Sequence, residues 1–344
     1  MIIIIIAGGS GTRLWPISTP EYPKHLLKIN GDNLSLLQHT YERAKKLGNE
    51  IYVISEEGHV KHVKDQLKEL PKGSFIVEPA RRGTANCIIA GLTKIKQIVD
   101  PDEPIAVLSA DHYVRDTDGF THTFKVASEI SDQYKRIVLI GIEPNYPATG
   151  FGYIQKDKHL RTKHLAYSVH SFKEKPDFNT AKHYLKSGNY LWNCGYFVAS
   201  LNTFVQEMQL YSAELYKNYQ KLLGSHESFN EIYLGLNNQT IDYGLIEKIK
   251  EPLVVPASFD WLDLGSYADL HKVVDSDEKG NHIKGDRVKI FEIENSFIQS
   301  FDNKPLIVIG LDNVVVVNTP NGTLVTRKDL SQKVGDLSKN FYNK

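Results

Sequence analysis

Short apolar runs rich in β-branched residues alternate with amphipathic stretches through the first two-thirds of the chain. The runs predict buried strands at Ile2–Ile6, Ile51–Ile54, Phe75–Val77, Ile105–Leu108 and Ile137–Ile140. The stretches between them repeat apolar residues at helical spacing, and Thr84 is placed to cap a helix that runs to about Ile98. Alternation of strands and helices with short joints predicts a Rossmann-like, mostly parallel α/β sheet with helices on both faces.

The pattern changes twice further along the chain. From about residue 150, we expect strands at Phe151–Gln155, Ala166–Phe172 and Tyr196–Ser200, followed by helical sequence from Thr203 to about Leu223. After Gly280 the sequence becomes β-rich, and we expect strands at Val288–Ile293, Leu306–Ile309, Val314–Asn318 and Thr323–Thr326. We therefore place a boundary in the polar stretch 275–281, which gives a large domain over residues 1–278 and a small β-rich domain over residues 279–344.

Two finer expectations concern the small domain. Asn321-Gly322 is the dipeptide typical of a type I′ hairpin turn. No internal repeat is regular enough to name, and no segment is of low complexity.

A glycine-rich loop follows the first predicted strand directly. Gly8, Gly9 and Gly11 lack Cβ atoms, so a ligand can approach the backbone and meet several N–H groups at once. Arg13 and Lys24 add two cations, which makes this loop a candidate site for a polyanion such as a nucleoside triphosphate. The loop is neither a P-loop nor a G-x-G-x-x-G turn, because both spacings differ.

Composition narrows the class of protein. The 344 residues contain 41 Lys+Arg and 41 Asp+Glu, so the formal net charge is zero, which argues against a general nucleic-acid binder. The two cysteines form no C-x-x-C pair and predict buried, reduced thiols. No apolar run approaches the length of a membrane span. We therefore expect a cytoplasmic protein with no nucleic-acid or membrane partner.

The string from Gly8 to Lys24, G-G-x-G-T-R-L-W-P followed by P-K, resembles the sugar-nucleotide pyrophosphorylases, and the Trp15 form resembles their mannose-1-phosphate guanylyltransferases. The resemblance extends over about three-quarters of the chain. It implies transfer of GMP from GTP to mannose 1-phosphate, with Mg²⁺ as cofactor and a β-helix-like C-terminal extension. Nucleotide contacts would come from the loop and from two later segments: Ala7, Gly8, Gly9, Gly11, Thr12, Glu78, Arg82, Thr84 and Ser109.

The metal site implied by the resemblance has two carboxylates. Asp111 follows a buried strand within Ser109–His112, and Asp263 lies in a segment similar to the family's W-x-D-x-G-S-[WY]. Magnesium commonly takes one or two carboxylates together with phosphates. Arg13, Lys24 and Lys175 would then be the catalytic cations.

Sugar contacts are implied at three further segments. Glu174-Lys175-Pro176 resembles the family's E-K-P, whose carboxylate holds sugar hydroxyls and whose lysine meets phosphate. Gly152 and Asn193 lie in segments similar to T-G-Y-G-Y-I and W-N-x-G-x-F. The segment from Thr240 to Lys248 resembles S-I-D-Y-x-x-x-E-K and is expected to be a helix that supports the pocket.

The base-reading segment departs from the family pattern. Glu78 could accept from the two N–H donors of guanine, but Gly83 and Asn86 replace the asparagine and the proline of E-P-x-x-R-N-T-A-P-A. Another base or sugar therefore stays open, for example a heptose-1-phosphate guanylyltransferase. A glycosyltransferase would carry D-x-D instead, and a non-catalytic sugar-nucleotide sensor would have lost a charged site residue. A homodimer is compatible with the resemblance.

Overall fold

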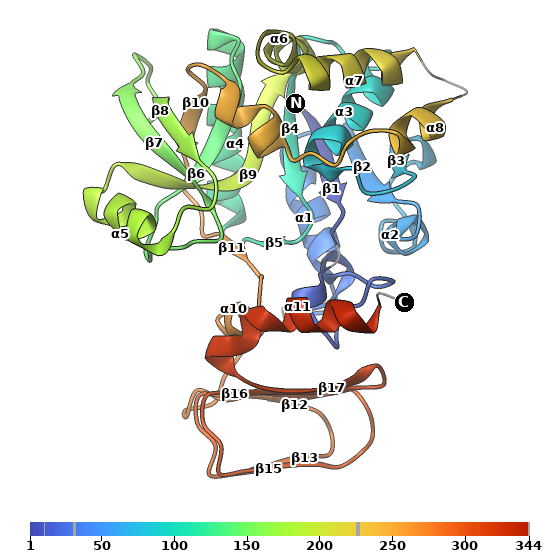
Figure 1. Cartoon of the computed structure of the whole chain (residues 1–344), viewed down its shortest axis with the longest axis vertical. Helices are drawn as coiled ribbons and strands as arrows, with labels where there is room; N and C mark the ends of the chain where they lie inside the picture. Colours follow the sequence, from blue (N-terminus) through green and yellow to red (C-terminus); the bar gives the residue numbers. More distant parts are fainter. Residues whose placement is uncertain (10, 30–31, 225–227, 343–344) are drawn as a thin grey trace. The chain divides into compact units, whose positions relative to one another are not determined.

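A computed structural model describes residues 1–9, 11–29, 32–224 and 228–342 of the chain (Figure 1). The chain forms two compact units, and each is described by itself. The first unit comprises Met1–Ala7, Thr40–Ala110 and Val114–Trp261; the second comprises Gly8–His39, Asp111–Tyr113 and Leu262–Lys344. This division differs from the boundary expected at residue 278, because the glycine loop groups with the C-terminal residues.

A nine-stranded sheet forms the first unit, in the order β3-β2-β1-β4-β9-β6-β10-β8-β7. Its strands are β1 (Ile2–Ala7), β2 (Ile51–Glu56), β3 (Phe75–Glu78), β4 (Pro104–Ser109), β6 (Val138–Ile142), β7 (Gly152–His159), β8 (Tyr167–Lys173), β9 (Tyr190–Ser200) and β10 (Leu253–Pro256). Strands β3, β2, β1 and β4 run parallel, whereas β9 is antiparallel to β4, to β6 and to β7, with which it also pairs. The α/β class is confirmed, and the sheet is mixed.

Helices cover both faces of this sheet. Phe197 of β9 shares a core with Ile88 and Leu92 of α3 (Gly83–Ile95), while its neighbour Tyr196 packs on Phe120 and Phe124 of α4 (Thr117–Tyr134). Successive strand residues point to opposite faces, so α3 and α4 cover opposite sides. The remaining helices of this unit are α2 (Val60–Gln66), α5 (Phe178–Ser187), α6 (Leu201–Tyr211), α7 (Ala213–Leu223), α8 (Phe229–Leu234) and α9 (Ile241–Gly244), and α1 (Leu36–Lys45) begins in the other unit.

Two local expectations have different outcomes. The segment from Thr203 to about Leu223 is helical as expected and forms two helices, α6 and α7, which are separated at Ser212. Thr84 does not cap α3, because Arg82 is the N-cap residue and the Thr84 hydroxyl lies inside the first turn. That hydroxyl instead accepts a hydrogen bond from the backbone N–H of Ile241 at 2.9 Å.

The C-terminal residues form a short parallel coil of strands (Figure 1). Strands β12 (His282–Lys284), β14 (Phe297–Ser300) and β16 (Val314–Thr319) are parallel neighbours, and β13 (Val288–Phe291) pairs in parallel with β15 (Leu306–Ile309). The predicted β-helix-like character is thereby confirmed. The unit also contains the two-residue strands β5 (His112–Tyr113) and β11 (Leu262–Asp263) and the helices α10 (Tyr267–His271) and α11 (Val334–Ser338).

Two strand pairs of the coil, β13 with β15 and β14 with β16, are offset by 18 residues, a repeat that the sequence pattern did not reveal, whereas β12 and β14 are offset by 15. Asn295 and Asn313 lie one coil apart, and the Asn295 Nδ2 donates to the Asn313 Oδ1 at 2.6 Å. Both residues have left-handed backbones (φ 48° and 55°), as do Glu292 and Gly310 one coil apart. The repeat is carried by corner conformations and stacked asparagines, while the intervening residues differ, so periodic hydrophobicity alone did not show it.

Alternation along the coil strands builds two cores. Ile298, Val314 and Val316 face the interior of the coil. Phe297, Val315 and Val317 face the other way and pack with apolar residues of the glycine-loop segment and α10, among them Leu14, Ile29, Leu264 and Tyr267. This second core explains why residues 8–39 group with the C-terminal residues.

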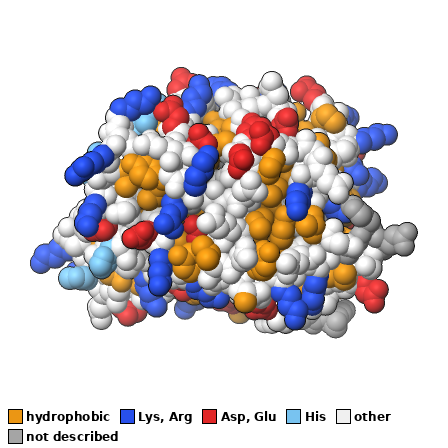
Figure 2. Space-filling view, turned by 90° about the horizontal axis from the view of Figure 1, so that it is seen from above, with side chains coloured by type: hydrophobic (Ala, Val, Ile, Leu, Met, Phe, Trp, Pro, Cys, Tyr) orange, Lys and Arg blue, Asp and Glu red, His pale blue; other side chains and the backbone are white. Residues whose placement is uncertain are grey.

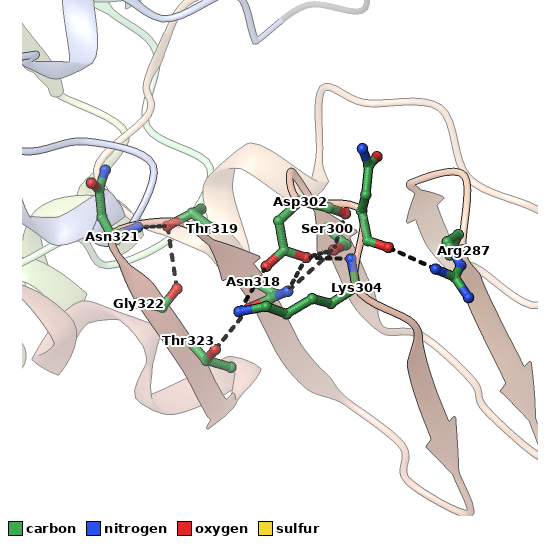
Figure 3. A network of polar contacts seen from close by, with 10 residues as sticks. Arg287, Ser300, Asp302, Lys304, Asn318, Thr319, Asn321, Gly322 and Thr323 are labelled. Carbon is green, nitrogen blue, oxygen red and sulfur yellow. Dashed lines mark hydrogen bonds and ion pairs between the residues drawn. The ribbon is translucent and has the colours of Figure 1, made fainter.

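A polar network closes the last coil (Figure 3). The Asn318 Nδ2 donates to the Asp302 Oδ1 at 2.8 Å, and the Asn318 Oδ1 accepts from the Thr323 hydroxyl at 2.8 Å. The hairpin between β16 and β17 (Gly322–Arg327) is confirmed, but Thr319 pairs with Gly322, so the loop is Pro320-Asn321. A type I′ turn is wrong here, because Pro320 holds φ negative at the first central position.

Candidate active site

Lys24 lies between two carboxylates within the second unit. Its Nζ is 2.8 Å from the Asp111 Oδ2 and 2.8 Å from the Asp263 Oδ1. The Lys24 side chain is 6 % exposed, while the two carboxylates are 27 % and 22 % exposed. Asp263 pairs with His112 across β11 and β5, and this pairing sets the two aspartates beside each other. The structure therefore brings together three of the predicted site residues.

The charges at this site stabilise one another. Burial by itself would lower the pKa of Lys24, but the charges and hydrogen bonds of Asp111 and Asp263 outweigh burial and raise it. Burial would likewise raise the pKa of Asp263, and the ammonium of Lys24 reverses that effect and lowers it. Lys24 and Asp263 therefore each stabilise the charged form of the other.

The two aspartates fit a magnesium site. The described residues contain no cluster of three or more His, Cys, Asp or Glu side chains suited to a metal. Two carboxylates nevertheless converge on one point, which the Lys24 ammonium takes, and Mg²⁺ commonly needs only one or two carboxylates when phosphates complete its coordination. The donor set therefore suits a metal shared with a phosphate ligand.

The glycines of the loop have different surroundings. Gly11 is left-handed (φ 57°), and a Cβ there would lie 2.6 Å from the backbone N of Lys24. Gly9 (φ 104°) is exposed, with nothing within 4 Å of a Cβ position. Gly11 thus allows the loop to pack on Lys24, whereas Gly9 leaves room for a ligand. Gly8 is partly exposed after buried Ala7, Thr12 is buried, and Ser10 lies outside the described residues.

Arg13 adds a second cation near the predicted metal ligand Asp263. Its Nη2 lies 4.0 Å from the Asp263 Oδ2, and its side chain is 50 % exposed. A Cβ at Gly265 would lie 3.0 Å from the Arg13 Nη1, so the glycine of the Leu262–Ser266 segment makes room for the guanidinium. The guanidinium is therefore placed beside the lysine–aspartate cluster with half of its surface open to a ligand.

The predicted sugar residues converge in the first unit. Gly152 pairs with Asn193 across β7 and β9, and a Cβ on Gly152 would lie 2.4 Å from the Glu174 Oε2. The Glu174 carboxylate is largely buried and accepts from the Lys175 ammonium at 2.9 Å, while Lys175 is 58 % exposed. These side chains form one polar cluster on the neighbouring ends of β7, β8 and β9.

Asp242 belongs to this cluster, although sequence reasoning gave its segment only a supporting role. The Asn193 Nδ2 donates to the Asp242 Oδ1 at 2.9 Å. Burial, followed by the charge of Glu174, raises the pKa of Asp242 to about 6. The expected helix is α9 followed by a 3₁₀ turn, Ile246–Lys248. The carboxylate in the T-I-D-Y string was the available signal for this residue.

The residues predicted to read the base are held by protein partners. Glu78 ends β3, is buried, and accepts a hydrogen bond from the Tyr233 hydroxyl; burial raises its pKa. Arg82 donates from Nη2 to the Leu234 carbonyl at 2.6 Å. Ser109 ends β4 opposite Ile6. Glu78 and Arg82, like Thr84, are thus fixed by the segment 233–241.

Gly83 and Asn86, which differ from the family pattern, also contact the segment 233–241. Gly83 (φ 80°) leaves no room for a Cβ, which would lie 2.1 Å from the Gln239 carbonyl oxygen. The Asn86 Nδ2 donates to the carbonyls of Arg82 and Asn237 at 2.7 and 2.8 Å. Gly83 and Asn86 therefore anchor the base-reading segment through close backbone contacts with residues 237–239.

Comparisons with known proteins agree with this geometry. A family model described as nucleotidyl transferase matches residues 2–280, and one described as the MannoseP isomerase/GMP-like β-helix domain matches residues 285–340. A mannose-1-phosphate guanylyltransferase of Klebsiella pneumoniae is 35 % identical over 97 % of this chain and 72 % of its own length. One from Escherichia coli is 35 % identical over 98 % of this chain and 75 % of its own length.

Solved structures show the same fold. A Thermus thermophilus protein described as a mannose-1-phosphate geranyltransferase superposes with a TM-score of 0.87 at 26 % identity, covering 99 % of both chains. A UDP-glucose pyrophosphorylase bound to UDP-glucose superposes with a TM-score of 0.53 at 18 % identity, covering 79 % of this chain and 97 % of its own, a likeness of fold alone.

Proposed function

Since this chain belongs to the nucleotidyl transferase family and, within it, to the mannose-1-phosphate guanylyltransferases, we propose that it transfers GMP from GTP to mannose 1-phosphate. The products are GDP-mannose and pyrophosphate. The observation that carries the proposal is the buried Lys24 between Asp111 and Asp263, which joins the two predicted metal carboxylates to the glycine loop.

The reaction needs positioning and charge neutralisation but no covalent intermediate. A phosphate oxygen of mannose 1-phosphate attacks the α-phosphorus of GTP, and the bond to the β-phosphate oxygen breaks as pyrophosphate leaves. We assign the amides of Gly8 and Gly9, with Arg13 and Lys24, to the triphosphate and to the charge that develops on the leaving group. Asp111 and Asp263 would hold Mg²⁺, which when bound neutralises phosphate oxygens.

The polar cluster of the first unit is assigned to the sugar phosphate. Lys175 is the exposed cation of that cluster and orients the phosphate of mannose 1-phosphate. Glu174 and Asn193 bind hexose hydroxyls, because a carboxylate accepts from hydroxyl groups and an amide both donates and accepts. Gly152 keeps space at the Glu174 carboxylate.

We further propose that Glu78, Arg82, Thr84 and Ser109 form the nucleotide-binding wall and favour guanine. The Tyr233 hydroxyl donates to the Oε2 of Glu78. In this proposal the N–H donors of guanine therefore bind the Oε1 of Glu78. Anchoring by residues 233–241 supports a rigid wall of this kind.

Further features support the remaining parts of the proposal. The family-model matches, which end at 280 and begin at 285, support domains over 1–278 and 279–344. Cys87 and Cys194 are buried and unpaired, which supports a cytoplasmic location. Acidic and basic side chains are interspersed on the face in Figure 2, which supports small-molecule substrates over nucleic acid. No helix in the described part of the chain has the length and apolar character needed to span a membrane.

A substrate matrix tests the proposal. GTP, ATP, UTP and dTTP are each combined with mannose, glucose and heptose 1-phosphates, and pyrophosphate release is measured with Mg²⁺ present. We expect the highest kcat/KM for GTP with mannose 1-phosphate, and loss of turnover in Asp111→Asn with the fold retained. A maximum at another pair would reassign the substrate, whereas no release from any pair would refute nucleotidyl transfer.

A further inference from the structure

The last helix packs directly on the arginine of the phosphate loop. In α11, Gly335 lies so close to Arg13 that a Cβ on the glycine would be 2.6 Å from the Arg13 Cγ and 3.4 Å from its backbone N. At the other end of the same side chain, Gly265 lies beside the guanidinium. Arg13 thus has glycine backbone at both its stem and its tip, and any side chain at Gly335 would displace the stem.

The backbone of the loop is held by the same C-terminal segment. The buried Ser338 hydroxyl donates to the carbonyl of Thr12 at 3.1 Å. The ring of Phe341 lies 5.3 Å from that of Trp15, centroid to centroid. Residues 334–341 therefore contact the loop on both sides of Arg13 in the chain.

We propose that residues 334–341 are a positioning element for Arg13, through Gly335 at its side chain and Ser338 at the preceding carbonyl. The inference rests on the proposed function, in which Arg13 meets the triphosphate. A free arginine side chain loses rotamer entropy when it is immobilised. Holding the stem beforehand reduces that loss and places the guanidinium where charge develops, so the small C-terminal domain contributes to catalysis.

A double-mutant cycle with inorganic tripolyphosphate tests the inference without requiring turnover. Binding is measured by calorimetry for the wild type, Gly335→Ala, Arg13→Ala and the double variant. We expect Gly335→Ala to weaken binding about tenfold, and to have no further effect in the Arg13→Ala background, because its influence passes through Arg13. Leu337→Ala is the matched control, since this side chain on the same helix is 68 % exposed.

Ser338→Ala provides a milder second variant if Gly335→Ala does not fold. Loss of one hydrogen bond should weaken tripolyphosphate binding about threefold to tenfold, and Ser338→Thr should restore it. Three results would each overturn the inference. Gly335→Ala could weaken tripolyphosphate binding equally with and without Arg13, both α11 variants could bind as tightly as the wild type, or the wild type could fail to bind tripolyphosphate. Tripolyphosphate binding with the expected cycle, but no pyrophosphate release from GTP, would refute the proposed function alone.

Discussion

Lys24→Ala should destabilise the protein in a way that Mg²⁺ corrects. The substitution removes an ammonium that lies 2.8 Å from each of two carboxylates and leaves Asp111 and Asp263 facing each other, with the half-exposed Arg13 guanidinium, 4.0 Å from Asp263, as a more distant cation. Breaking a fully buried ion pair costs about 3–5 kcal/mol. Because about a quarter of each carboxylate is exposed here, we expect about 2–3 kcal/mol, which for a chain of this length is a fall in Tm of about 3–4 °C.

Magnesium distinguishes this cause from a general packing defect. If Mg²⁺ binds the two aspartates as proposed, it competes with the Lys24 ammonium for the same oxygens in the wild type, whereas in the variant that competing ammonium is gone. Added MgCl₂ should therefore raise the Tm of Lys24→Ala more than that of the wild type.

Thermal unfolding with EDTA or with excess MgCl₂, and without nucleotide, measures both effects. Lys28→Ala is the matched control, because Lys28 is exposed in the same segment. An unchanged Tm in Lys24→Ala, or an equal response to Mg²⁺ in the variant and the wild type, would refute the reasoning.

Three further variants test other parts of the site. The raised pKa of Asp242 means that the native state holds this proton more tightly than the unfolded chain, so the free energy of unfolding should fall as the pH rises from about 4 to about 6. Asp242→Asn should abolish that fall and be about 1–3 kcal/mol more stable than the wild type at neutral pH, as urea unfolding at two pH values will show. Asn86→Ala removes donors to two carbonyls and should cost about 1–3 kcal/mol in urea unfolding, against little change for the exposed Arg115→Ala. Glu78→Gln should reduce the preference for GTP over UTP more than it reduces the rate with the better substrate, and equal kcat/KM for the two nucleotides in the wild type would remove Glu78 from base reading.

The local parts of this protein follow from its sequence. The apolar run at Ile2–Ala7 is buried because β-branched residues fit an inner strand, and the glycines after it permit the turn that follows. Strand–helix alternation indicated the α/β class, and the motif strings gave Asp111, Asp263, Arg13 and Lys24 as candidate site residues, which the structure places close together. These features depend on neighbours in the chain, which a sequence displays directly.

Contacts between distant segments were decided only by the tertiary structure. Lys24 meets Asp263 across 239 positions, and Ser338 reaches Thr12 across 326. Glycine at 335 indicates only a permissive backbone until the fold shows that Arg13 takes the space. Strand order is likewise decided by the tertiary structure, because β9 lies antiparallel between β4 and β6 through pairing with strands distant in the sequence. Local patterns specify conformation and burial, whereas strand register and chain packing determine which distant residues meet.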